Sequence, residues 1–162
     1  MRLFNSKQEE LETPYSFQDR FKNIQRIAIV YPQKHEHLRI ARYAMQNLYN
    51  LPERFEFLIM QSAEASRFAL GIEFQLGEMN YEPTKTDRER LLNRFVAFNP
   101  DILLQLEPEP DDRLIKLLKS VPIGLKIGFG PEDSGLNIIY SQKKTGFYEK
   151  NILNLIALIR AD

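Results

Sequence analysis

Two short segments of the chain gather residue types that could bind a ligand or move a proton. The first, "PQKHEHLR", contains Lys34, His35, Glu36, His37 and Arg39. An adjacent histidine and glutamate can act as a base and as the group that orients it, and a lysine or arginine beside them can hold an anion. The plainer interpretation is the solvated start of a helix, where mixed charges are common.

The second segment, "LEPEPDD", is rich in carboxylates: Glu107, Glu109, Asp111 and Asp112. A Mg²⁺ site needs carboxylates that converge from more than one element, whereas these share one loop and are separated by prolines. Acidic side chains in the first turn stabilise a helix dipole, and Pro110 suits the first turn with Glu109 or Asp111 near the cap. The pattern therefore favours a helix start over a metal site, with Glu107 and Glu109 kept as candidates for binding a ligand.

The elements around these segments decide where they lie. Short apolar runs predict strands within residues 26–32, 54–61, 72–81, 101–106, 124–130 and 136–140. Helical spacing of apolar residues, with caps and stops, predicts helices within residues 35–52, 62–71, 86–100, 110–120 and 148–160. Strands that alternate with helices predict a three-layer, Rossmann-like α/β fold: a mostly parallel sheet of five or six strands with helices on both faces.

One connection does not fit this alternation. The strands within 124–130 and 136–140 are too close in sequence for a helix between them, so one lies at an edge or joins the sheet by another route. Ligands of an open parallel sheet bind beyond the carboxyl ends of its strands. Both polar segments follow predicted strands and are expected at that edge.

Composition excludes several classes of function. The 22 Lys plus Arg balance 22 Asp plus Glu, so no basic surface for nucleic acid is expected. The chain has no cysteine and only two histidines, which excludes thiolate chemistry and a histidine-rich metal site. No glycine lies between Arg26 and Asn50, where a dinucleotide would need a glycine-rich turn, and no cofactor is expected.

Two expectations concern organisation and location. Residues 1–23 read as a polar N-terminal arm, and residues 24–162 as a single Rossmann-like domain. No apolar stretch approaches the roughly 20 residues that cross a bilayer, and the polar N-terminus does not resemble a secretory signal. The cytoplasm is the expected location.

Three stretches carry a family resemblance: "RIAIVYP", "FEFLIMQSAEASRF" and "FNPDILLQLEPEPDDRLIKLLKSVPIGLKIGFG". They resemble the N-terminal domain of family-9 glycosyltransferases, the heptosyltransferases of lipopolysaccharide synthesis. Asp101–Leu106 and Lys126–Phe129 stand where that family shows "DLVIDL" and "RIGF". The C-terminal part is also similar to a family of uncharacterised single-domain bacterial proteins, which implies no known activity.

The resemblance implies a fold more than a reaction. In the transferases a second domain binds the nucleotide sugar, and the loop after the first strand carries a Gly-Asp pair, where this chain has "PQKHEH". The leading hypothesis is a non-catalytic relative of that domain, acting through protein contacts, in a homo-oligomer or an assembly. The alternative is a small enzyme or binder of an anionic sugar or nucleotide; a transferase activity would need a second domain or chain.

Overall fold

The computed structural model describes residue 21 and residues 23–51, 54–61, 77–80, 88–140 and 146–160. Most of the expected N-terminal arm and all of the helix expected within residues 62–71 lie outside these ranges. No helix in the described part is both long and apolar enough to cross a membrane.

The described elements follow each other in the expected order. They are β1 (Arg26–Val30), α3 (His35–Tyr49), β2 (Glu56–Gln61), β3 (Gly77–Asn80), α5 (Arg88–Phe98), β4 (Ile102–Gln105), α6 (Asp112–Ser120), β5 (Lys126–Phe129), β6 (Ile138–Tyr140) and α7 (Gly146–Arg160).

The strands form one six-stranded sheet in the order β3-β2-β1-β4-β5-β6, and every pairing is parallel. The chain runs outward from β1 to β3, crosses back to β4, and continues to β6. This arrangement confirms the predicted Rossmann-like α/β fold. β6 lies at the edge beside β5, and no helix occurs in the residues 130–137 between them, as the short spacing required.

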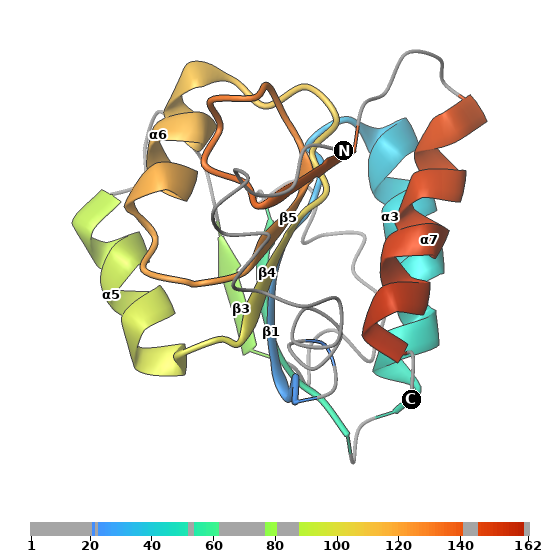
Figure 1. The fold of residues 1–162 in the computed structure, drawn as a ribbon, viewed down its shortest axis with the longest axis horizontal. Helices are drawn as coiled ribbons and strands as arrows, with labels where there is room; N and C mark the ends of the chain where they lie inside the picture. The colour runs from blue at the N-terminus through green and yellow to red at the C-terminus, as the bar shows by residue number, and fades with distance from the viewer. Residues whose placement is uncertain are drawn as a thin grey trace, which may run out of the picture.

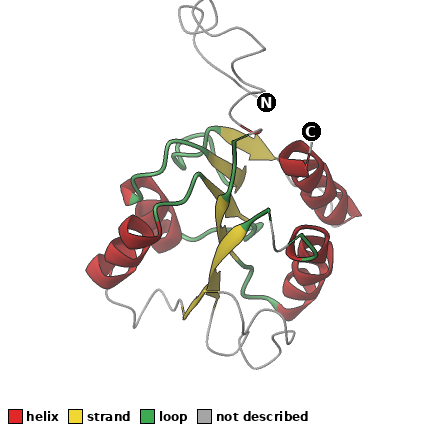
Figure 2. Ribbon diagram, turned by 90° about the horizontal axis from the view of Figure 1, so that it is seen from below, coloured by secondary structure: helices red, strands yellow, loops and turns green. Residues whose placement is uncertain are grey.

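Helices cover both faces of the sheet. Figures 1 and 2 show α3 and α7 side by side on one face and α5 and α6 on the other. Successive residues of a strand point to opposite faces. In β1, Ile27 and Ile29 therefore pack with α3 and α7, whereas Ala28 and Val30 pack with α5 and α6.

The acidic loop before α6 caps that helix. Asp111 is the N-cap residue, and its Oδ1 accepts a hydrogen bond from the backbone N–H of Leu114 at 2.8 Å. Pro110 was expected inside the first helical turn, but the helix begins at Asp112, so Pro110 precedes the cap. By binding one of the free N–H groups of the first turn, this carboxylate stabilises the start of the helix.

The apolar surface of α7 is covered mainly by the core. Ile152, Leu155, Ile156 and Ile159 are buried against the sheet and α3. Phe147 and Leu153 are the exceptions, with 47% and 43% of their surface exposed. The chain itself therefore covers most of the apolar surface of this helix.

β4 is held at its amino end by a carboxylate. Asp101, just before the strand, accepts hydrogen bonds through Oδ2 from the backbone N–H groups of Gln25 and Arg26, at 2.8 and 2.9 Å. These two groups belong to the start of β1. Asp101 therefore fastens the entrance of β4 to the entrance of β1.

β4 and β5 approach each other closely at one residue. A Cβ atom placed on Gly128 would lie 2.0 Å from the backbone oxygen of Gln105. Because that obstacle is backbone, it cannot swing aside as a side chain could. Glycine is required at this position.

Candidate functional site

The two polar loops meet at the point where the strand order reverses. β1 and β4 are neighbours in the sheet, with Val30 paired to Gln105, yet the chain leaves them in opposite directions. The loop from β1 to α3 and the loop from β4 to α6 consequently open side by side at the carboxyl end of the sheet. Crevices at such a switch point are the usual ligand sites of open α/β sheets.

A buried glutamine shapes the second loop. The side chain of Gln105 is inaccessible to solvent, and its Nε2 donates to the backbone oxygens of Glu107 and Phe129 at 2.8 and 2.7 Å. Its Oε1 accepts from the backbone N–H of Glu107 at 2.7 Å. These bonds turn the chain sharply after β4 and fix the backbone from which the Glu107 side chain projects.

Glu107 is half-buried and reaches across to the first loop. Its Oε2 accepts a hydrogen bond from the backbone N–H of Gln33 at 3.2 Å. Burial raises the pKa of Glu107 to about 7; the Gln33 hydrogen bond and the Lys34 charge oppose this rise, and the nearby Glu109 and Asp111 carboxylates add to it. The carboxyl group can therefore gain and lose a proton near neutral pH.

An ion pair joins the same two loops on the solvent side. Lys34 Nζ lies 3.3 Å from Glu109 Oε2, and both side chains are largely exposed. Exposed pairs of this kind contribute little stability. The pair matters because it places one positive charge near Glu107.

The helices α3 and α7 also contact the loop from β4 to α6. The His37 and Tyr148 rings meet edge to face with centroids 4.9 Å apart, and the Tyr148 hydroxyl donates to the backbone oxygen of Leu106 at 2.6 Å. Burial, and secondly the Glu107 charge, raise the pKa of Tyr148 well above its usual range, so its hydroxyl stays protonated. Nδ1 of His37 is buried and has no hydrogen-bond partner among the described groups.

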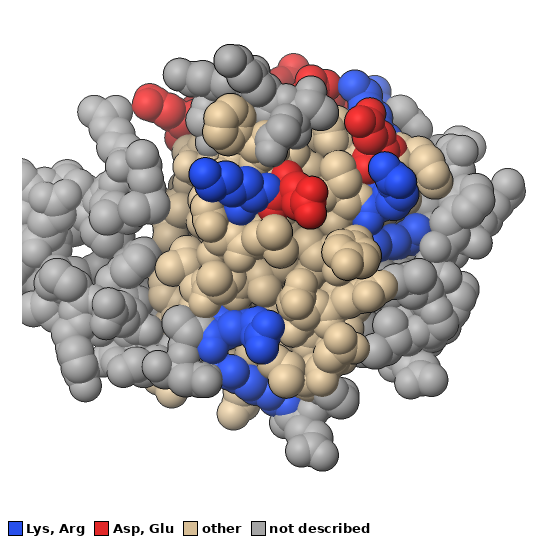
Figure 3. Space-filling view, turned by 90° about the vertical axis from the view of Figure 1, so that its right-hand side faces the viewer, with Lys and Arg blue, Asp and Glu red and all other residues tan. Residues whose placement is uncertain are grey.

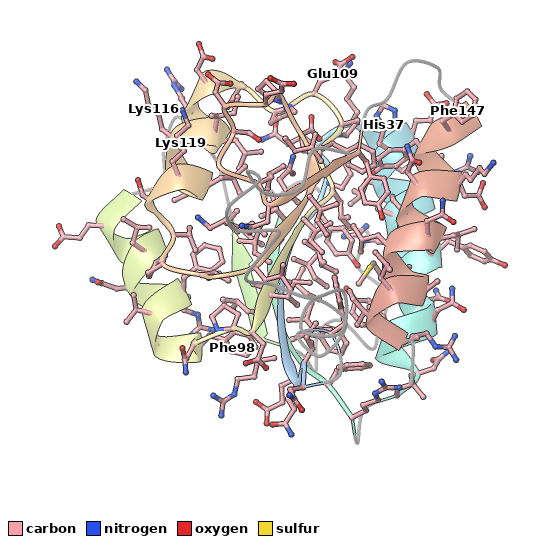
Figure 4. The ribbon with its side chains drawn as sticks, in the orientation of Figure 1. His37, Phe98, Glu109, Lys116, Lys119 and Phe147 are labelled. Atoms are coloured by element: carbon pink, nitrogen blue, oxygen red, sulfur yellow. The ribbon has the colours of Figure 1, made fainter. Side chains whose placement is uncertain are left out.

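The structure thus brings together Lys34, His37, Glu107 and Glu109 of the candidates, and Figure 4 shows His37 and Glu109 at the same end of the molecule. His35 and Glu36 are exposed in the first turn of α3. Arg39 lies elsewhere, on an outer groove that it lines with Tyr43 and Glu149.

Two residues of the crevice were not singled out from the sequence, although both leave a signal there. Gln105 is the polar residue within the apolar run "ILLQL". Tyr148 continues the buried stripe of α7, four residues before Ile152. A polar group on an otherwise apolar stripe must find a partner when it is buried. Here the partners are backbone groups of residues 106 and 107, and for Gln105 also the backbone oxygen of Phe129.

The arrangement disfavours a phosphate at the start of α3. In nucleotide-binding sheets the helix after the first strand directs its free N–H groups at a phosphate. Here Glu107 accepts a hydrogen bond from the Gln33 N–H, two residues before that helix, and so places a carboxylate beside the helix start. No cluster of three or more potential metal ligands occurs in the described ranges either. What the two loops offer to a ligand is the titrating carboxyl of Glu107 and the exposed Lys34–Glu109 ion pair.

Comparison with known proteins supports the fold. No protein-family model matches the chain, and no curated protein matches its sequence. Among solved structures it is similar to E. coli heptosyltransferase WaaC with ADP-2-deoxy-2-fluoro heptose, with a TM-score of 0.59 and 13% sequence identity. The match covers 82% of this chain and 47% of that chain, so this chain spans about half of that protein. At this identity the likeness shows a shared fold and leaves the activity open.

Proposed function

We propose that the chain binds a neutral, hydroxyl-rich ligand of the sugar type in the crevice between the β1–α3 and β4–α6 loops. The observation that carries the proposal is Glu107: a half-buried carboxyl at the switch point of the sheet, with a pKa of about 7. In its charged form it accepts a hydrogen bond from a hydroxyl, and in its neutral form it donates one. It can also take a proton from a hydroxyl that reacts.

The neighbours of Glu107 favour a neutral ligand over an anionic one. A phosphate would meet the carboxylates of Glu107 and Glu109, and the Lys34 ammonium is already paired. A sugar hydroxyl can bond to Glu107 without such repulsion. We therefore expect a nucleotide to bind this site more weakly than a neutral sugar.

The resemblance to glycosyltransferases fits the same ligand class. If the fold acts as it does in a two-part transferase, Glu107 would accept the proton of the attacking sugar hydroxyl, and a second domain or chain would supply the sugar donor. This step is proposed for Glu107 on its own geometry, because it does not occupy the position of the family's Gly-Asp pair.

Saturation-transfer NMR at pH 7.5 tests the binding step, with neutral hexoses and heptoses in one panel and ADP as a separate probe. We expect one or more of the sugars to bind the wild-type protein with a millimolar dissociation constant. Glu107→Gln keeps the size of the side chain but cannot ionise, and it should weaken that sugar at least tenfold.

Glu109→Gln is the matched control. It makes the same change in a largely exposed side chain two residues away, and it should change sugar binding less than twofold. The proposal fails if no sugar binds the wild type, or if the two variants behave alike.

A role as a non-catalytic subunit is the second candidate. It is favoured by the segment "PQKHEH", which lacks the Gly-Asp pair of the transferases after the first strand. A protein whose crevice binds no sugar, and which copurifies with a fixed protein partner in constant ratio, would support this candidate over the first.

A further inference from the structure

The outer face of α3 and α7 carries an unusual share of exposed apolar surface. Of the large hydrophobic side chains exposed in the described residues, Tyr43 (71%), Phe147 (47%) and Leu153 (43%) belong to these two helices, and Val96 (58%) belongs to α5. Uncharged residues fill the middle of this face, and charged side chains lie around it (Figure 3).

A groove on this face lies beside its most exposed aromatic ring. Arg39, Ile40 and Tyr43 of α3 and Glu149 of α7 line it, and its volume is about 260 Å³. Residues four apart share a helix face, so Tyr43 follows Arg39 on α3, and Leu153 follows Glu149 on α7. The groove therefore combines a projecting ring, an apolar floor and opposite charges on its two helices.

These features are self-complementary. In a two-fold symmetric interface, a residue i of one copy contacts j of the other, and j contacts i in return. Tyr43 can enter the groove of a second copy while the second copy's Tyr43 enters the first. The same symmetry can bring Arg39 of each copy to Glu149 of the other, which pairs the charges twice.

We propose that a second copy of this chain binds this face, and that the protein is a two-fold symmetric homodimer through α3 and α7. Each helix has 15 residues, and the pair presents a face about 22 Å long and roughly 20 Å wide. Such a face is smaller than the roughly 800 Å² per partner of a standard interface, so a micromolar dissociation constant is expected.

Sedimentation velocity from 1 to 200 µM protein tests the dimer. The wild type should shift from monomer to dimer across this range. Tyr43→Glu should raise the dissociation constant at least a hundredfold. Circular dichroism at 1 µM, where the wild type is also monomeric, should show an unchanged melting temperature because the side chain is exposed. Val96→Glu, an equally drastic change at an exposed site on the opposite side of the sheet, should leave the dimer intact.

A charge-reversal mixture tests the pairing between copies. Arg39→Glu and Glu149→Arg should each weaken self-association about tenfold. When the two variants are mixed in equal amounts, a heterodimer should form within threefold of the wild-type affinity, because opposite charges again face each other across the interface. An effect within one copy could not be rescued by mixing.

The proposal is overturned if the wild type is monomeric at 200 µM, or if Tyr43→Glu dimerises like the wild type. Failure of the mixture to regain association would reject the two-fold arrangement of Arg39 and Glu149. None of these outcomes depends on whether a sugar binds in the crevice.

Discussion

Two carboxylates hold β1 to β4, one at each end of the strands, and they do so in different ways. Asp101, at the amino end, is exposed and accepts two backbone N–H groups with a single oxygen. Glu107, at the carboxyl end, is half-buried and accepts one N–H group from the described residues, at 3.2 Å.

Asp101 forms a structural contact, a clasp between the starts of β1 and β4, whereas Glu107 is a carboxyl whose protonation changes near neutral pH. The charge of Asp101 is stabilised by water and by two N–H donors. Glu107 is partly buried and lacks equivalent hydrogen bonds, which raises the free energy of its charged form. The free-energy cost appears as the raised pKa of about 7. The same pair of strands thus has a well hydrogen-bonded carboxylate at one end and a carboxyl with a raised pKa at the other.

Gln105→Leu should have the largest effect on stability, because it removes the hydrogen bonds that fix the loop from which Glu107 projects. The change leaves the backbone N–H and oxygen of Glu107 and the oxygen of Phe129 without their partner. We expect the free energy of unfolding in urea to fall by about 2–4 kcal/mol. Gln33→Leu, the same change at an exposed site, should cost less than about 0.5 kcal/mol. Equal stabilities of the two variants would refute the role given to Gln105.

Asp101→Ala tests the clasp at the other end and should have a smaller effect. It removes the acceptor of the Gln25 and Arg26 N–H groups, which water can partly replace because the site is exposed. Urea denaturation should show a loss of about 1–2 kcal/mol. Asp133→Ala, at an exposed aspartate before β6, is the control with no expected loss. If Asp101→Ala were as stable as that control, the clasp would be refuted.

Glu107→Gln sharpens the comparison because its effect should have the opposite sign and depend on pH. The folded carboxyl keeps its proton up to about pH 7, and the ordinary value is 4.5. The native state therefore binds more protons between these values, and its stability falls as pH rises from about 4.5 through 7. At pH 8 the variant should be more stable than the wild type by about 1 kcal/mol, allowing for solvent at this half-buried site.

Below pH 4.5 that advantage should vanish, because the wild-type carboxyl is then neutral in both states. Thermal melts of the wild type, Glu107→Gln and Glu109→Gln at pH 4, 6 and 8 provide the measurement. A stability difference between wild type and Glu107→Gln that stayed constant from pH 4 to pH 8 would contradict the raised pKa.

The sequence predicted the fold well because parallel strands buried on both faces are continuous apolar runs. The segments that became β1 and β4 are such runs, and all of their residues from Ile27 to Val30 and from Ile102 to Gln105 are buried. The short connection between residues 124–130 and 136–140 predicted that one of the two strands lies at an edge or joins the sheet by another route, and β6 lies at an edge.

The candidate site could be predicted only in part. Lys34 and Glu107 follow neighbouring parallel strands, so their shared edge was predictable from the order of elements. The bond from Gln33 to Glu107 depends on the turn that Gln105 imposes, and the contribution of Tyr148 depends on how the last helix returns to Leu106. Arg39 was expected with the histidines, but the helix turns by about 100° per residue and carries it to the outer groove.

The close packing at Gly128 explains why a distant sequence resemblance can indicate a fold without indicating a function. The segment "KIGF", which carries part of the resemblance to the glycosyltransferases, contains the glycine whose Cβ would collide with the backbone of Gln105. A glycine required by the space between two strands reflects how the sheet is built, whatever the loops beyond it bind. A resemblance that rests on such residues therefore indicates the fold and leaves the chemistry open.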